Sequence, residues 1–214
     1  MNRDLKDYRK SYEKGMLLEK DIPNDPFILF RSWFETADAS PEVDEANAMS
    51  ISTVGKDMMP KTRIVLLKGY DLQGFYFYTN YSSEKGRALE ENPQCCISFF
   101  WPALEKQIII QGMAEKISKE ASEAYFHSRP RGSQLGALAS DQSSQIESRT
   151  VLEEKLNKLE QDLEGKEIPL PQSWGGYIVK PRSFEFWQGR RSRLHDRIRF
   201  SLNAGNWNIE RLAP

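Results

Sequence analysis

The sequence contains few of the residues that build metal sites or disulfide frameworks. Two cysteines, Cys95 and Cys96, and two histidines, His127 and His195, are the whole supply in 214 residues, and they show no metal-ligand spacing. Neighbouring residues on a strand point to opposite faces, so we expect two free thiols and no bridge between them. No apolar run approaches the ~20 residues that a membrane helix needs.

The chain also lacks an excess of either charge. Thirty Lys and Arg residues balance 31 Asp and Glu residues, for a formal net charge of −1. Nucleic-acid binding usually leaves a basic surplus, so we expect no nucleic-acid partner. The lack of a long apolar run likewise predicts no membrane partner. The charged residues 1–15 contain no apolar core of a secretory signal, which predicts a cytoplasmic protein. Basic clusters in such a chain are local and favour small anionic ligands.

Short strand patterns dominate the chain. Runs rich in β-branched and aromatic residues occupy 48–54, 62–67, 75–78, 95–101, 107–114, 175–179, 184–187, 198–202 and 207–212. Helices are expected after Asp25-Pro26, where a capping side chain precedes proline, and at 83–91, 118–128 and 149–163. The pattern predicts a mainly β protein with peripheral helices, either an antiparallel barrel or a sandwich. We expect an arm at residues 1–20 and one domain at residues 21–214.

Two stretches place cations beside hydroxyl groups or strand ends. Arg63 and Lys68 bracket an apolar strand, and residues five apart point to opposite faces, so both can simply be solvent-facing charges. Tyr125 and Arg129 share a helix face before Pro130, and Ser133 can begin the next short helix. Together they suit a phosphate, although a capped helix end with a surface arginine fits the same pattern.

Two further stretches are polar. Residues 141–144 (DQSS) read as a loop between helices and are a weak indication of a site. Residues 190–197 hold four arginines around His195, which suggests an anionic partner in a neutral protein. A histidine has an ordinary pKa of about 6.5, so His195 can exchange a proton near neutral pH. If this segment is extended, Arg193 and His195 share a face.

Together these stretches resemble the pyridoxine/pyridoxamine 5′-phosphate oxidase family. The motifs run in order along nearly the whole chain: RKSYEKG at 9–15, RIVLLK at 63–68, FYTN at 77–80, YFHSRPRGSQLGA at 125–137, QSS at 142–144, WGG at 174–176, EFWQG at 185–189, RLHDR at 193–197 and RLAP at 211–214. The resemblance implies an FMN-binding split β-barrel of antiparallel Greek-key type. It also implies a homodimer with each active site at the subunit interface.

The resemblance carries specific residues with it. It implies that FMN is bound by Arg63, Ile64, Val65, Leu66, Leu67, Lys68, Tyr78, Thr79, Lys85, Gln107, Gln142, Ser143, Trp187 and Arg197. It implies that substrate is bound by Lys68, Tyr125, Arg129, Ser133, Arg193 and His195, with Arg9 and Tyr12 closing over it as a lid. Arg193 and His195 are the expected catalytic residues, and no metal is expected.

The implied reaction moves a hydride from the 4′-carbon of pyridoxine or pyridoxamine 5′-phosphate to FMN. It yields pyridoxal 5′-phosphate, with ammonia released from the amine, and dioxygen reoxidises the flavin to give hydrogen peroxide. One position departs from the family. Glu84 stands where the family usually has an arginine beside the flavin phosphate, and a carboxylate cannot donate that charge-assisted hydrogen bond. Either Glu84 points to solvent or a neighbour such as Arg87 compensates, so we leave Glu84 out of the expected site.

Three alternatives stay open on the sequence alone. A split-barrel flavin reductase using a nicotinamide cofactor needs no GxGxxG motif, so the lack of that motif does not exclude it. A non-catalytic flavin- or vitamer-binding protein would not need the titratable His195 beside Arg193. A purely structural β-domain would leave the arginine cluster unexplained.

Overall fold

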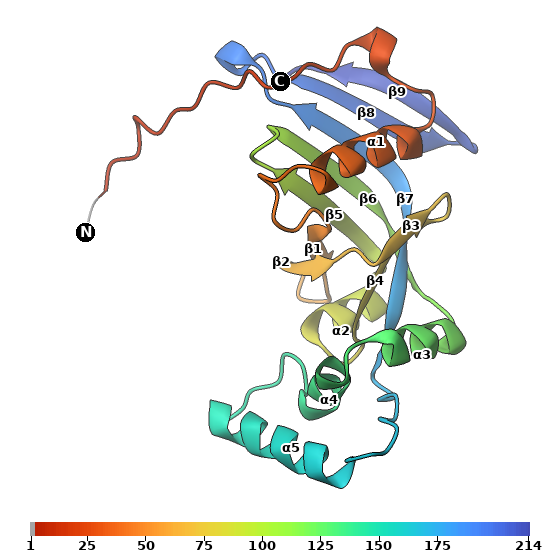
Figure 1. Ribbon diagram of the computed structural model, residues 1–214. Helices are drawn as coiled ribbons and strands as arrows, with labels where there is room; N and C mark the ends of the chain where they lie inside the picture. Colours follow the sequence, from red (N-terminus) through yellow and green to blue (C-terminus); the bar gives the residue numbers. More distant parts are fainter. Residues whose placement is uncertain (1–2) are drawn as a thin grey trace. The chain divides into compact units, whose positions relative to one another are not determined.

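The computed structural model describes residues 3–214 (Figure 1). Its strands are β1 (Ala48–Val54), β2 (Pro60–Leu66), β3 (Gly69–Asp71), β4 (Gly74–Asn80), β5 (Gln94–Trp101), β6 (Lys106–Lys116), β7 (Trp174–Gln188), β8 (Asp196–Asn203) and β9 (Asn206–Leu212). Its helices are α1 (Pro26–Asp38), α2 (Glu84–Glu91), α3 (Lys119–Ser128), α4 (Arg131–Ala139) and α5 (Arg149–Asp162), with 3₁₀ turns η1 (Glu19–Asp21) and η2 (Arg191–Arg193). The predicted class, mainly β with peripheral helices, is confirmed.

The strands pair in the order β2-β1-β5-β6-β7-β4-β3, and β8 pairs with both β7 and β9. The pairs β3–β4, β4–β7, β7–β8 and β8–β9 are antiparallel. One expectation was wrong: 175–179 and 184–187 belong to a single strand, β7. Its first half, 174–179, pairs with β4 and its last part, 183–188, pairs with β8. Pro181 lies between these two ladders, where its missing N–H costs neither of them a hydrogen bond.

The chain divides into two compact units. The terminal unit comprises the residues up to Met49, Ile97–Gln111 and Pro181–Pro214, and the central unit comprises Ser50–Cys96 and Gly112–Lys180. Strands β5, β6 and β7 each contribute residues to both units. The predicted boundaries, an arm at 1–20 and one domain at 21–214, stay a prediction, and residues 1 and 2 of that arm lie outside the described residues.

Helix α1 supplies the aromatic core of the terminal unit. The Asp25 side chain accepts a hydrogen bond from the Phe27 N–H at 2.9 Å, so the predicted N-cap is confirmed. The rings of Phe27, Phe30 and Trp33 then pack edge-on against aromatic side chains of β5 and β7, at centroid distances of 5.3 to 5.4 Å. Edge-to-face packing of this kind adds to the area that each ring buries.

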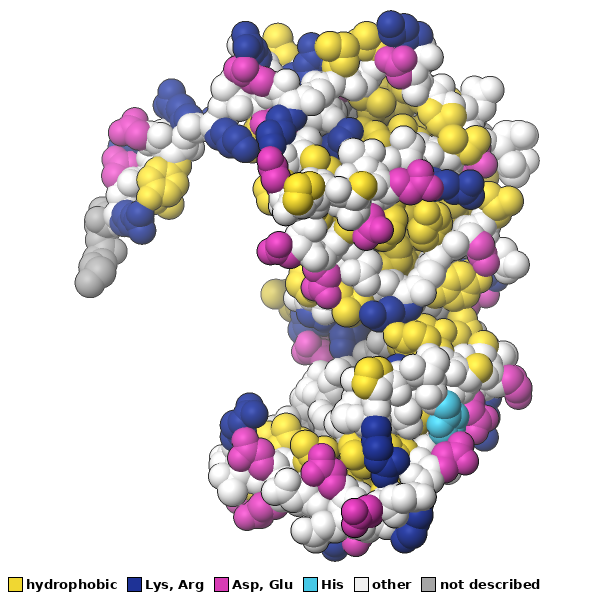
Figure 2. Space-filling view, in the orientation of Figure 1, with side chains coloured by type: hydrophobic (Ala, Val, Ile, Leu, Met, Phe, Trp, Pro, Cys, Tyr) yellow, Lys and Arg dark blue, Asp and Glu magenta, His cyan; other side chains and the backbone are white. Residues whose placement is uncertain are grey.

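The central unit has a smaller core beneath its helices. Phe126, Leu135, Ile168 and Trp174 form a buried cluster, and Leu156 and Leu159 of α5 pack against it together with Leu163, which follows the helix. The apolar face of α5 therefore covers this core, whereas Val151 near its start is exposed, and charged side chains cover the helix's outer face (Figure 2). The helices predicted at 83–91 and 118–128 are confirmed, and Ser83 and Ser118 cap them through their hydroxyl groups.

Cys95 and Cys96 are free, and burial raises the pKa of the Cys95 thiol to about 12, which keeps it protonated. Within residues 3–214, no helix combines the length and the apolar character needed to cross a membrane.

Candidate active site

A cavity of about 500 Å³ opens in the central unit, a volume typical of small-molecule sites. It is lined by β2 and the residues after it, by β4, and by residues of α2, α3, α4 and the loop that follows α4. The lining residues are Ile64, Val65, Leu66, Lys68, Tyr78, Thr79, Asn80, Lys85, Tyr125, Arg129, Ser133, Gly136, Ala137, Ser140, Gln142 and Trp174. Segments as far apart in the sequence as Ile64 and Trp174 therefore meet at one cavity.

Lys85 is a buried cation in the lining of this cavity. Its Nζ donates hydrogen bonds to Thr79 Oγ1 at 3.1 Å and to Gln142 Oε1 at 2.9 Å, both of which are neutral acceptors. Burial, and then the nearby Arg63, lowers the pKa of the Lys85 ammonium to about 8. Such a lysine gains from the arrival of an anion, which would favour its charged form.

Arg129 brings a second cation to the cavity. Its Nη1 is buried, and no hydrogen-bond partner for it exists among residues 3–214. Its guanidinium carbon lies 4.9 Å from the centroid of the Trp174 ring. A buried N–H group without an acceptor is costly, so this atom is an open position for an oxygen of a ligand.

Aromatic rings form a flat wall of the cavity. Tyr78 stacks on Tyr125 with ring centroids 3.8 Å apart and on Trp174 with centroids 5.5 Å apart. Gly176 lies close by, and a Cβ there would come within 2.8 Å of the Tyr78 ring. The WGG motif thus contributes Trp174 to the wall, and its Gly176 leaves room for the Tyr78 ring.

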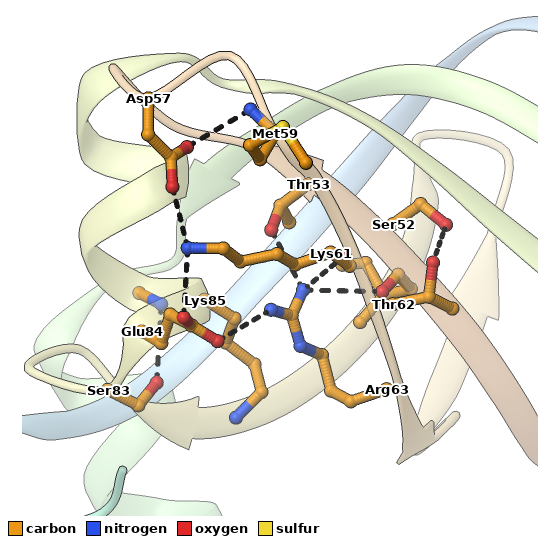
Figure 3. Close-up of polar contacts among 12 residues, drawn as sticks. Ser52, Thr53, Asp57, Met59, Lys61, Thr62, Arg63, Ser83, Glu84 and Lys85 are labelled. Carbon is orange, nitrogen blue, oxygen red and sulfur yellow. Dashed lines mark hydrogen bonds and ion pairs between the residues drawn. The ribbon is translucent and has the colours of Figure 1, made fainter. Parts of the chain in front are cut away.

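A second cavity shares Lys85 and Gln142 with the first. Its lining also includes Lys61, Thr62, Arg63, Glu84 and Ser143. The Arg63 Nη1 donates to Thr53 Oγ1 at 2.8 Å and to the Lys61 carbonyl at 2.9 Å, while Nη2 lies 3.5 Å from Glu84 (Figure 3). Arg63 lines this cavity and Lys68 lines the first, so the two ends of the RIVLLK motif serve different cavities.

The terminal unit holds a separate aromatic cluster of predicted site residues. The Tyr12 ring packs edge-on against Trp187 at 5.6 Å and near His195 at 5.7 Å, and Trp187 lies 4.7 Å from His195. The residue paired with Trp187 across β7 and β8 is Arg197, which donates to Glu185 at 2.8 Å and to the Ala213 carbonyl at 2.9 Å. Tyr12 therefore docks its arm segment on two of the predicted site residues.

The hydrogen bond of His195 defines its tautomer. Its Nδ1 accepts the Arg190 backbone N–H at 3.0 Å, so the hydrogen of the neutral ring lies on Nε2. Burial and the neighbouring Arg193 lower the pKa of the imidazole, against a smaller opposite effect of Asp196. At neutral pH, His195 is thus a neutral donor through Nε2–H.

Glu105 anchors the arm, and sequence reasoning missed it. Its buried Oε2 accepts the backbone N–H groups of Glu13 at 2.7 Å and Lys14 at 2.9 Å. The Gly189 N–H donates to the Glu105 carbonyl at 2.8 Å, and a Cβ on Gly189 would meet Tyr12 at 2.8 Å. An acidic residue in a turn gave no indication of this role.

Several predicted residues lie differently from what the sequence suggested. Arg193 does not share an extended face with His195, because η2 covers Arg191–Arg193 and Arg193 has a positive φ of 61°. Arg9 is exposed and donates to the Lys6 carbonyl at 3.2 Å. Leu67 is buried and lies outside the lining of both cavities.

The remaining predicted residues divide between the two units. Gln107, in the terminal unit, is half-buried and donates to Ser98 Oγ at 3.4 Å. All the other flavin and phosphate residues from Arg63 to Ser143 belong to the central unit. The structure also adds Trp174 and Lys61 to the cavity linings, and of these only Trp174 lay within a quoted motif.

Comparison with known proteins gives consistent results. The chain matches the family model described as pyridoxamine 5′-phosphate oxidase over residues 36–161, and the model described as the pyridoxine 5′-phosphate oxidase C-terminal dimerisation region over residues 174–214. The pyridoxine/pyridoxamine 5′-phosphate oxidase of Christiangramia forsetii is 70% identical over 214 residues, 100% of both chains. That of Flavobacterium psychrophilum is 57% identical over 213 residues, 99% of this chain and 100% of the relative.

Solved structures show the same fold. PhzG from Burkholderia lata 383, in complex with tetrahydrophenazine-1-carboxylic acid, has a TM-score of 0.87 and 28% identity, covering 96% of this chain and 100% of its own. A pyridoxamine 5′-phosphate oxidase-related, FMN binding protein from Nostoc punctiforme has a TM-score of 0.70 and 16% identity, covering 90% of this chain and 100% of its own. The predicted split β-barrel is thereby confirmed.

Proposed function

Because this chain belongs to the pyridoxine/pyridoxamine 5′-phosphate oxidase family, we propose that it oxidises both phosphorylated vitamers to pyridoxal 5′-phosphate with FMN as its cofactor. Relatives at 50 to 70% identity over essentially their full length bear the name of this activity. The observation that carries the proposal is the buried, unpartnered Arg129 Nη1 in a cavity that also holds Lys85.

The donors of the two connected cavities fit a phosphorylated flavin. The Lys85 ammonium donates its hydrogen bonds to neutral acceptors. Arg63, Gln142 and Ser143 line the second cavity together with it. We assign the FMN phosphate to this end, with the strand from Ile64 to Leu66 along the flavin. When bound, FMN supplies the hydride acceptor, and dioxygen reoxidises it with formation of hydrogen peroxide.

The other end of the cavity suits the substrate phosphate. Lys68, Tyr125, Arg129 and Ser133 offer two cations and two hydroxyl groups, which are strong partners for a phosphate dianion. The buried Nη1 of Arg129 would gain the acceptor that it lacks. Fixing the phosphate in this way would hold the vitamer's ring in one orientation, and orientation alone supplies much of a rate enhancement.

His195 and Arg193 would act on the substrate's polar edge. Because the His195 Nδ1 is engaged by the Arg190 N–H, its Nε2–H is the group available to a ligand. We therefore assign His195 a positioning hydrogen bond rather than acceptance of a proton. Tyr12 already packs on His195 and Trp187, which supports an arm that closes over the substrate and excludes water.

We also propose a homodimer with shared active sites. The region that matches the dimerisation model, residues 174–214, contains Trp187, Arg193, His195 and Arg197. These residues lie in the terminal unit, whereas the cavity with Arg129 lies in the central unit. In a dimer, the terminal unit of one subunit would complete the cavity of its partner.

The decisive test is the visible spectrum of the purified protein. It should show a bound oxidised flavin, which chromatography after heat release should identify as FMN and not FAD. Anaerobic addition of pyridoxamine 5′-phosphate should bleach it, and admitting air should restore it. Unphosphorylated pyridoxamine is the matched control and should bleach it far more slowly. Recovery of FAD, a protein that stays colourless after FMN is added, or a spectrum unchanged by the substrate would reject the proposal.

A further inference from the structure

Lys61 lies at the centre of a charged cluster in the lining of the second cavity. Its Nζ is 2.8 Å from Asp57 Oδ2 and 3.0 Å from Glu84 Oε1 (Figure 3). Glu84 in turn contacts Arg63 through its other oxygen at 3.5 Å. One carboxylate therefore joins two cations that come from the same face of strand β2.

The charge of this cavity is suited to a phosphate. Its lining contains three cations, Lys61, Arg63 and Lys85, and one carboxylate, Glu84, which leaves a surplus of two positive charges. A phosphate monoester carries about −1.5 to −2 charges at neutral pH. Without Lys61 the surplus would be a single charge, too little to balance the dianion.

The contacts of Glu84 with Lys61 and Arg63 can break without leaving either cation unpaired. Lys61 keeps its contact with Asp57, and Arg63 keeps Thr53 and the Lys61 carbonyl. The Glu84 side chain is 48% exposed, so its carboxylate can turn to water at little cost. An entering phosphate oxygen can thus replace Glu84 as the acceptor for Lys61 and Arg63.

We propose that Lys61 is a further phosphate-binding residue of the cofactor site, and that Glu84 is the positioning residue that holds it at the cavity before the phosphate enters. The proposal rests on the proposed function in one respect, that the phosphate is that of FMN. It explains how the cavity keeps its positive surplus although position 84 carries a carboxylate.

The test is titration of the flavin-free protein with FMN, followed by quenching of flavin fluorescence. Lys61→Met should raise the dissociation constant of FMN about tenfold, the loss expected for one charge-assisted hydrogen bond. Lys61→Arg should keep the affinity within about threefold of the parent, since it retains the cation. Lys56→Met is the matched control, because Lys56 pairs with Glu91 outside the cavity lining and its side chain is 83% exposed.

Riboflavin separates a phosphate contact from a general disturbance of the site. Because riboflavin has no phosphate, Lys61→Met should leave its affinity unchanged. The double variant Lys61→Met with Glu84→Arg adds a second measurement. It replaces the carboxylate by a cation that lines the same cavity, and should recover FMN affinity to within about threefold of the parent.

Three results would overturn the inference: parental FMN affinity in Lys61→Met, equal losses for FMN and riboflavin in that variant, or failure of the double variant to recover affinity. Failure of the proposed function would look different. In that case the parent protein itself would not bind FMN, whatever residue stood at position 61.

Discussion

Replacing Arg129 by methionine removes the guanidinium from the central cavity and keeps most of the side chain's bulk. In the parent protein, the Arg129 Nη1 is buried without a partner among the described residues, and the guanidinium packs over Trp174. The variant therefore removes a proposed contact with the ligand. It also removes a buried N–H group that destabilises the ligand-free protein because it lacks an acceptor. These two effects can be measured separately.

The expected loss follows from the chemistry of the contact. A hydrogen bond to a charged group contributes about 1.5–3 kcal/mol, and every 1.4 kcal/mol changes affinity about tenfold. Arg129→Met should therefore raise the KM for pyridoxine 5′-phosphate by about 10- to 100-fold. Stability should change little. The unpartnered N–H costs about 1–3 kcal/mol, and the lost contact with the Trp174 ring offsets it by up to about 2 kcal/mol.

The assay is steady-state kinetics with pyridoxine 5′-phosphate and with pyridoxine, beside thermal unfolding of the flavin-free protein. The unfolding midpoint should stay within about 4 °C of the parent value. Arg149→Met is the control, because the Arg149 side chain is 86% exposed and forms its ion pair with Glu153 on α5, away from the cavity lining. An unchanged KM for the phosphorylated vitamer would refute the assignment, as would equal use of both vitamers by the parent enzyme.

Three further predictions follow from the same geometry. The FMN dissociation constant should be nearly constant below about pH 7, be about twofold higher at pH 8 and rise toward tenfold per pH unit above that, because the Lys85 ammonium, with its pKa lowered to about 8, must be charged to bind phosphate; Lys85→Met should bind weakly without this rise. His195→Asn should lower kcat/KM without removing an acidic limb of the pH profile, whereas loss of that limb would make His195 a proton acceptor. Light scattering should give about twice the chain mass of 24.8 kDa, and a fully active monomer would exclude shared active sites.

Local sequence determined most of the secondary structure. A run rich in β-branched residues predicted β1 at its observed bounds, and the capping carboxylate of Asp25 before Pro26 predicted the start of α1. These features depend on neighbours within about four residues, so the sequence contains the information. The sequence did not predict that β7 continues through Pro181, because proline ordinarily argues against a strand. The strand tolerates Pro181 because it changes its pairing partner from β4 to β8 there, and that change depends on the tertiary structure.

The candidate site was predicted in its residue types and only partly in its arrangement. Resemblance identified Lys85 and Gln142, which the structure joins at 2.9 Å, and Tyr125 and Arg129, which line one cavity. It did not indicate Glu105, whose buried carboxylate binds backbone N–H groups of the arm. Every residue type except proline has a backbone N–H, so the sequence of the arm does not indicate which side chain will accept its hydrogen bonds.

By itself, the sequence determined the β-rich class, the helix caps and the types of residue that meet an anion. Tertiary structure decided which of them meet. Lys61 and Glu84 are 23 positions apart and form an ion pair only because β2 and the start of α2 are adjacent. The Arg129 Nη1 is an open donor only because α3 ends where Trp174 covers its guanidinium. The physical reason is that burial and charge pairing depend on distances in space, whereas a sequence pattern reports only separations along the chain.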